Sequence, residues 1–179
     1  MEMEWDDNPE EEDQGEQGPE VEIQNNFYEA EAIYKTEKQN AIDKFEVVIM
    51  MEESHGTCEF SFSSLRYVII LCMELAQFDK MIEQAKVLLR FSTRPTVSKN
   101  QLSEAINDIQ DSISKHLVEH PQEAKHMYEL ILGNLKQTNE RLWFSTSLRL
   151  GKIYLDEKNF DGLERVILEL KDQCRDPQP

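Results

Sequence analysis

The stretch DEKNFDGLERVILELK (residues 156–171) repeats the pattern of an earlier stretch, ELAQFDKMIEQAKVLL (residues 74–89). In each, a phenylalanine followed by aspartate (Phe78 and Phe160) opens a run of apolar residues at helical spacing. The acid suits the exposed amides of a helix N-terminus. The two phenylalanines lie 82 residues apart, which is two units of about 41 residues, a period typical of solenoids built from helix pairs. The pattern predicts an α-helical repeat protein; the alternative is unrelated helices with a chance similarity.

The chain beyond residue 22 has the same helical periodicity. Ile106, Ile109 and Ile113 step by three and four residues, which is typical of the core-facing stripe of an amphipathic helix. Strand signals are nearly absent, and the prolines lie in the tails or between the periodic runs. We therefore predict an all-α fold, a right-handed α-solenoid of about four TPR-like helix pairs, as one domain over residues 23–175. The expected helices cover residues 23–36, 39–53, 60–77, 79–92, 98–118, 122–137, 139–157 and 160–174.

The net charge of −17 is concentrated at the N-terminus. Residues 1–22 hold 11 acidic residues and no base, so they cannot bury enough apolar surface to offset the entropy of ordering. We expect a disordered acidic tail over residues 1–22 and a short C-terminal tail over residues 176–179. The N-terminal tail is either a solubilising segment or an acidic arm that binds a basic patch on a partner, with Trp5 as its anchor.

Composition and charge argue against several classes of protein. Residues 23–179 carry 25 acidic and 19 basic residues, which disfavours a nucleic-acid partner because phosphate contacts need a basic face. The acidic N-terminus does not resemble a signal peptide, and no apolar run reaches the ~20 residues of a membrane span. Cys58, Cys72 and Cys174 are odd in number and widely spaced, which favours reduced thiols. We expect a protein of the cytoplasm and nucleus with no membrane partner.

The segment HLVEH (residues 116–120) matches the inverted zinc-peptidase pattern H-x-x-E-H. Such a site needs both imidazoles on one face of a continuous helix and a third ligand from a carboxylate. Pro121 disfavours a helical conformation at His120, so we expect His116 and His120 to lie apart. The chain also lacks glycine-rich phosphate loops and nucleophile motifs. We therefore expect no metal site, no catalytic residue and no enzymatic activity; a zinc hydrolase is the remote alternative.

One group of basic residues is a candidate site for a phosphorylated ligand or an acidic partner segment. Lys86 and Arg90 are four residues apart on an expected helix, and Arg94 and Lys99 follow in the next connection. Arg66 is expected to reach this group from the preceding helix. The alternative is a solvated face on which nearby acidic residues balance these bases. The candidates for phosphate or partner binding are Arg66, Lys86, Arg90, Arg94 and Lys99.

The segment TNERLWFSTSLRLGKIYLDEKNFDGLERVILELKDQC (residues 138–174) resembles the N-terminal helical-repeat region of the COP9 signalosome subunit 2 family. In that family an Asn-(Asp/Glu)-Arg-Leu-Trp-Phe run is followed by a Leu-Gly-Lys-(Leu/Ile)-Tyr-Leu helix. Residues 139–144 and 150–155 match this pattern. A weaker likeness continues upstream through residues 41–53, 62–78 and 103–114.

The resemblance implies a non-catalytic scaffold. Its partners would be other signalosome subunits and a cullin–RING ubiquitin ligase during deneddylation, with catalysis supplied by a metalloprotease subunit of another fold. It also implies that basic residues of this region hold inositol hexakisphosphate, a site expected to be weakened or lost here because Ser63 stands where the family has a lysine. No other cofactor is expected, and the alternative within the fold class is a generic TPR-like or proteasome-lid-type adaptor. The family continues with further repeats and a PCI domain, so we expect this chain, which ends at DPQP, to be a fragment or a truncated relative.

Six residues of the resembling segment are expected to pack the repeats together. Trp143 and Phe144 are adjacent, so on a helix they point about 100° apart. A solenoid helix is covered by its pair-mate and by the preceding pair, and this can bury both directions. We therefore predict that both rings are buried between the third and fourth helix pairs. The packing residues are Leu142, Trp143, Phe144, Leu150, Gly151 and Tyr154.

Overall fold

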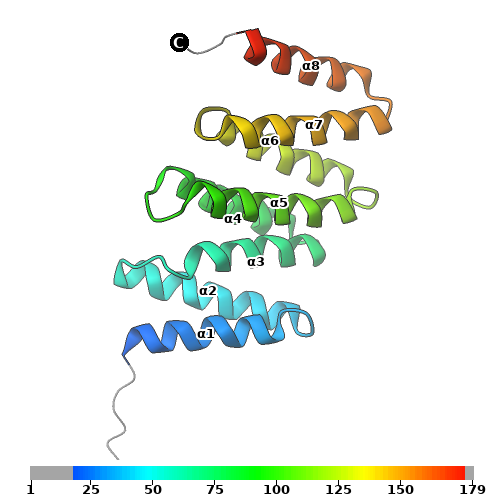
Figure 1. Ribbon diagram of the computed structural model, residues 1–179. Helices are drawn as coiled ribbons and strands as arrows, with labels where there is room; N and C mark the ends of the chain where they lie inside the picture. Colours follow the sequence, from blue (N-terminus) through cyan, green and yellow to red (C-terminus); the bar gives the residue numbers. More distant parts are fainter. Residues whose placement is uncertain (1–17, 176–179) are drawn as a thin grey trace, which may run out of the picture.

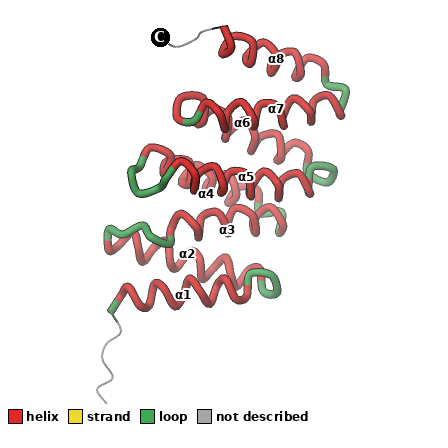
Figure 2. Tube along the Cα trace, in the orientation of Figure 1, coloured by secondary structure: helices red, strands yellow, loops and turns green. Residues whose placement is uncertain are grey.

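The computed structural model describes residues 18–175, so the expectations for residues 1–17, with Trp5, and for residues 176–179 lie outside it. The described chain forms helices joined by short turns, with no strand between residues 18 and 175 (Figures 1 and 2). The helices lie within a few residues of the predicted ones. In chain order they are α1 (Pro19–Ile33), α2 (Lys38–His55), α3 (Ser61–Glu74), α4 (Phe78–Arg90), the 3-10 turn η1 (Phe91–Thr93), α5 (Lys99–His116), α6 (Pro121–Thr138), α7 (Glu140–Asp156) and α8 (Phe160–Arg175).

The helices stack in chain order from α1 at one end to α8 at the other (Figure 1). Each packs on its neighbour in the chain across most of the stack, and α3 also packs on α5 and α4 on α6. The α3–α5 and α4–α6 contacts join helices that hold the same position in successive pairs, as in a helical-repeat array. The prediction of an all-α repeat solenoid is confirmed.

The two similar sequence stretches form similar turns. Ala76 and Lys158 each lie two residues before the phenylalanine that opens α4 or α8, and both have left-handed backbone, with φ of 54° and 57°. In each turn the following amide donates to the carbonyl five residues earlier, at 2.8 Å. This hydrogen bond is the signature of a Schellman motif, which ends a helix and reverses the chain. The 82-residue sequence repeat is therefore also a repeat of backbone geometry.

The acidic tail expected over residues 1–22 extends too far, because α1 begins at Pro19. Proline suits the first turn of a helix, where its missing amide has no partner to lose. Glu20 and Glu22 then lie in the first turn of α1, where a negative charge is favourable, and Ile23 and Phe27 are buried. Two of the acids counted as part of the tail, Glu20 and Glu22, are therefore N-terminal residues of the first helix.

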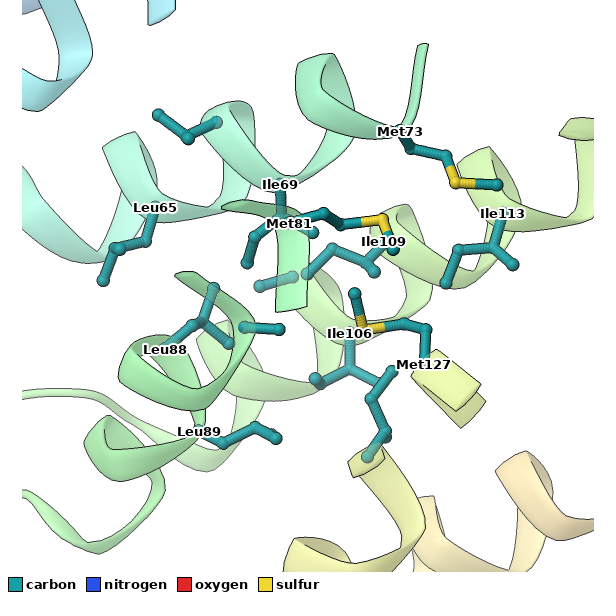
Figure 3. Close-up of a cluster of buried hydrophobic side chains, with 14 of the residues drawn as sticks. Leu65, Ile69, Met73, Met81, Leu88, Leu89, Ile106, Ile109, Ile113 and Met127 are labelled. Atoms are coloured by element: carbon teal, nitrogen blue, oxygen red, sulfur yellow. The ribbon is translucent and has the colours of Figure 1, made fainter. Parts of the chain in front are cut away.

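The core is a continuous layer of aliphatic, methionine and aromatic side chains between the stacked helices. Figure 3 shows its central part, where side chains from four helices meet. Residues of one helix recur at three- and four-residue spacing, which confirms the stripes read from the sequence. The labelled residues are Leu65, Ile69 and Met73 from α3, Met81, Leu88 and Leu89 from α4, Ile106, Ile109 and Ile113 from α5, and Met127 from α6.

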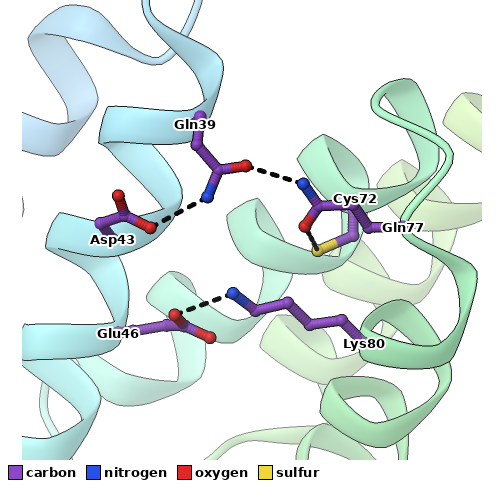
Figure 4. Close-up of polar contacts among 6 residues, drawn as sticks. All are labelled: Gln39, Asp43, Glu46, Cys72, Gln77 and Lys80. Carbon is purple, nitrogen blue, oxygen red and sulfur yellow. Dashed lines mark hydrogen bonds and ion pairs between the residues drawn. The ribbon is translucent and has the colours of Figure 1, made fainter.

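Polar contacts join α2 to α4 on the side of the even-numbered helices (Figure 4). The Lys80 ammonium lies 2.9 Å from the Glu46 carboxylate, and the Gln77 side-chain amide donates to the Gln39 side chain at 2.7 Å. Cys72 donates to Gln77 at 3.9 Å, and burial raises the pKa of its thiol to about 11. This thiol is a packed core group and not a reactive one.

Candidate partner-binding face

The odd-numbered helices α3, α5 and α7 form one side of the stack, and α5 supplies an aspartate to each of its neighbours. Asp108 binds the Arg66 guanidinium of α3 at 2.8 Å, and Asp111 binds the Arg149 guanidinium of α7 at 2.6 Å. The hydrogen bond with Asp111 is the main cause of a raised pKa at Arg149. We call the surface of α3, α5 and α7 that carries these two ion pairs the odd-helix face. On this face α5 contributes the two charged side chains Asp108 and Asp111.

A hollow of about 500 Å³ lies between α3 and α5 on the odd-helix face, and we call it the α3–α5 hollow. Two of its bases are already neutralised in part, because Arg66 binds Asp108 and Lys38 lies 3.0 Å from Glu74. Tyr67 is one of the two aromatic residues in the described lining of the hollow. Its pKa is raised to about 12 by burial and by the hydrogen bond that its hydroxyl donates to Glu31 of α1. Its lining includes Tyr34, Lys35, Lys38, Arg66, Tyr67, Ile70, Glu74, Asp108, Ser112 and Lys115.

A second hollow, of about 400 Å³, lies between the first turns of α5 and α7, and we call it the α5–α7 hollow. Asn139, the N-cap of α7, holds its rim: its side-chain oxygen accepts from the amide of Leu142 at 3.1 Å. The amide group of the same side chain reaches Ser103 on α5 at 3.4 Å. The cap of one helix therefore also ties it to the other. The lining comprises Lys99, Asn100, Ser103, Asn107, Asn139, Arg141, Leu142 and Ser145.

The five basic candidates do not form the single cluster expected from the sequence. Arg66 lines the α3–α5 hollow and Lys99 the α5–α7 hollow. Lys86 lines a third, wide hollow of about 1060 Å³ between α4 and α6, the even-numbered helices. Arg90 ends α4, and the Arg94 guanidinium lies 4.5 Å from the centre of a neighbouring phenylalanine ring. Successive helices of a repeat lie on opposite sides of the stack, so two bases that are close in sequence can face opposite sides. The spacing of the bases along the sequence does not reveal this.

Sequence reasoning missed four bases that line the two hollows of the odd-helix face. Lys35 lies in the turn between α1 and α2, Lys38 begins α2, Lys115 lies in the last turn of α5, and Arg141 lies in the first turn of α7. Each stands at a helix end, where the sequence signal is weak because such residues are commonly solvated. Only the stacking of the odd-numbered helices brings these bases into a hollow.

The aromatic pair of α7 is only half buried. Trp143 is 2% exposed, and the ammonium of Lys136 on α6 lies 6.0 Å from the centre of its ring. Phe144 is 41% exposed, so the prediction that both rings are buried is wrong for Phe144. The 100° step between adjacent side chains turns it away from the pair-mate and the preceding pair. The other expected packing residues, Leu142, Leu150, Gly151 and Tyr154, are buried.

The zinc-peptidase pattern is divided between two helices. His116 is the last residue of α5, and His120 is the N-cap of α6 with φ of −133°, as expected from Pro121. The His120 ring packs edge-on against Phe78, 4.8 Å between centres. No group of three or more histidine, cysteine or acidic side chains within residues 18–175 is placed to hold a metal ion. Within the same residues, no helix combines the length and apolar character of a membrane span.

Comparisons with known proteins give a consistent answer. No family model matches the chain. It is 34% identical over 162 residues to COP9 signalosome complex subunit 2 of Caenorhabditis elegans, which covers 89% of this chain and 32% of that protein. It is 30% identical over 160 residues to the same subunit of Drosophila melanogaster, with 88% and 35% covered. It is 28% identical over 155 residues to that of Dictyostelium discoideum, with 86% and 34% covered. The chain thus spans about a third of the length of these relatives, and the resemblance expected from its sequence is confirmed.

Proposed function

The chain is a divergent relative of COP9 signalosome subunit 2, and on this premise we propose that it is a non-catalytic helical-repeat scaffold which binds a cullin–RING ubiquitin ligase. The observation that carries the proposal is the likeness of almost the whole chain to one region of that subunit in several organisms. Other signalosome subunits would be its further partners, in the cytoplasm and nucleus. The deneddylation reaction would belong to another subunit.

The architecture supports a scaffold. A stack of helix pairs presents long faces and grows by adding neighbours, which suits binding to extended partner surfaces. The odd-helix face offers side chains of both signs, since Asp108 and Asp111 of α5 are each paired with an arginine of an adjacent helix. Complementary charges of this kind determine orientation and speed of association more than affinity.

We also propose the α3–α5 hollow as the place where inositol hexakisphosphate would bind. Its lining includes Lys35, Lys38, Arg66 and Lys115, and its volume of about 500 Å³ suits a ligand of that size. The fit is incomplete, because Glu74 and the aspartate on Arg66 lie in the same wall. Lys35 and Lys115, which carry no carboxylate partner in the described part of the chain, would supply the main contacts to phosphate.

Affinity capture of the tagged chain from cells, with identification of the bound proteins, tests the proposed function. We expect signalosome subunits and a cullin–RING ligase among the bound proteins. The double variant Lys35→Glu/Lys115→Glu should weaken cullin capture, while the matched variant Lys86→Glu on the even-numbered side should leave it unchanged. Capture of proteasome-lid subunits alone would instead support the generic adaptor. Calorimetric titration with inositol hexakisphosphate measures binding of the ligand separately from binding of the partner. The double variant should lower the affinity for the ligand, and Lys86→Glu should leave it unchanged.

A further inference from the structure

The α5–α7 hollow differs in charge from its surroundings. It is lined by two bases and by side-chain amides and hydroxyls, and none of the described residues in its lining is acidic. The chain as a whole carries 36 acidic and 19 basic residues. A concave, acid-free lining in so acidic a protein concentrates positive potential at one place.

The two bases of this hollow also have no ion-pair partner in the described part of the chain. Lys99 and Arg141 are exposed, and neither takes part in an ion pair among residues 18–175. By contrast, Arg66 and Arg149 on the same odd-helix face are each bound to an aspartate of α5. The hydrogen-bond donors beside the two free bases include the side-chain amides of Asn100 and Asn107 and further backbone amides in the first turns of two helices. Such a set of cations and neutral donors recognises carboxylates.

The chain itself contains the complementary segment. Residues 1–17 hold nine acidic residues and no base. We propose that this N-terminal segment binds in the α5–α7 hollow of its own chain, with carboxylates on Lys99 and Arg141.

The position of the first helix makes this contact reachable. The first turns of α1, α3, α5 and α7 lie on the same side of the stack in Figure 1, so the chain enters α1 on the side where the hollow opens. Packed helices lie about 10 Å apart, so the hollow is roughly 30 Å from the start of α1 along the stack. Seventeen residues of extended chain span up to about 58 Å. The tail is therefore long enough to place several of its acids in the hollow.

Carbodiimide cross-linking of the full chain tests the proposal, because it joins a carboxylate directly to a lysine amine without a spacer. At low protein concentration and low ionic strength, we expect the monomer to yield peptides that join residues 1–17 to Lys99. High salt should abolish this product, since screening weakens exposed charge pairs. Products dominated by Lys35, Lys86 or Lys115 would overturn the proposal.

Two variants and a mixing experiment complete the test. Arg141→Gln should lower the yield of the Lys99 product several-fold, while Lys152→Gln, the same loss of charge elsewhere on α7, should leave it unchanged; equal yields from both variants contradict the proposal. Circular dichroism of each variant verifies that it folds.

A mixture of isotope-labelled and unlabelled chains distinguishes the source of the tail. Cross-links within one isotope support binding within the chain, and mixed-isotope products would show that a second copy supplies the tail and that the proposal is wrong.

Discussion

Glu52 is a buried carboxylate with a structural role. It is 1% exposed, near the end of α2, and its two oxygens accept hydrogen bonds from the amides of Glu59, Phe60 and Ser61 at 2.6–3.1 Å. These amides open α3, where backbone donors lack partners within the helix and a negative charge is favoured. The end of one helix thus caps the start of the next.

Glu52→Gln should lower the free energy of unfolding by about 2–3 kcal/mol, because the amide loses the charge and turns two donors toward backbone donors. Urea denaturation measures the difference. Its matched control is Glu53→Gln, the exposed neighbour, which should change stability by less than about 0.5 kcal/mol. Equal effects of the two variants would mean that the cap contributes nothing to stability.

Trp143 and Phe144 form a second matched pair. Trp143→Ala removes a ring that is 2% exposed and should cost about 3–5 kcal/mol. Phe144→Ala removes a ring that is 41% exposed and should cost less than about 1 kcal/mol. Thermal and chemical denaturation of both variants checks the order. A large loss of stability in Phe144→Ala would indicate that the ring is covered in the protein in solution.

At the scale of single elements, the turns before α4 and α8 carry a removable strain. Ala76 and Lys158 adopt left-handed backbone, which is unfavourable for a residue with a Cβ and free for glycine. Ala76→Gly and Lys158→Gly should each raise the free energy of unfolding by about 0.5–1 kcal/mol. Ala85→Gly, inside α4 and buried, should lower it. A destabilising effect at both turns would show that these residues do not end their helices in this way.

The packing of α7 on α8 depends on one glycine. A Cβ at Gly162 would meet the ring of Tyr154 at 2.8 Å, whereas a Cβ at Gly133 in α6 would meet nothing within 4 Å. Alanine is the better helix former by about 1 kcal/mol, so Gly133→Ala should stabilise the protein. Gly162→Ala should destabilise it by about 1–2 kcal/mol, because ring and helix must move apart. Hydrogen exchange should locate the loss in α7 and α8.

The sequence predicted the positions of the helices better than which side chains those helices bury or bring together. Phe78 and Phe160 marked the starts of α4 and α8 because apolar periodicity and an acidic residue coincide there, and both signals are local. Phe144 and the basic candidates were misplaced for another reason. Whether a helical residue meets a neighbour depends on which sides of the helix the stack covers, and that is a property of distant contacts. Lys86 and Lys99 therefore lie in different hollows although they are 13 residues apart.

Across the whole molecule, the two end faces of the stack differ. The exposed residues of α1 are mostly polar, with only Val21 and Tyr28 as large apolar groups. The exposed side of α7 and α8 carries several large apolar residues. These are Phe144, Leu148, Leu155, Phe160, Ile167 and Leu168. A terminal helix of a repeat array needs a polar outer side for solubility, so α1 has the character of a cap and α8 does not.

Replacing exposed apolar residues of α8 by polar ones should therefore reduce nonspecific hydrophobic binding without loss of thermal stability. Ile167→Lys combined with Leu168→Glu, at 52% and 51% exposure, should lower binding of a hydrophobic dye and keep the midpoint of thermal unfolding within a few degrees. Val21→Lys, an isolated apolar residue on α1, is the control and should leave dye binding unchanged. A sharp fall in the midpoint of the double variant, dependent on protein concentration, would instead reveal that these side chains are buried in an assembly.

The two arginine–aspartate pairs on α5 link neighbouring helices of the stack through exposed charges. Arg66–Asp108 and Arg149–Asp111 join the alternate helices α3, α5 and α7 along one side and resist their separation, while Lys80–Glu46 joins α2 to α4 along the other side. Added salt weakens exposed pairs and leaves the apolar layers intact. The curvature of the molecule should then relax with rising ionic strength while its helical content stays constant, and small-angle scattering would record this as a growing radius of gyration. The span between the two ends of the molecule would then change without the loss of a helical turn.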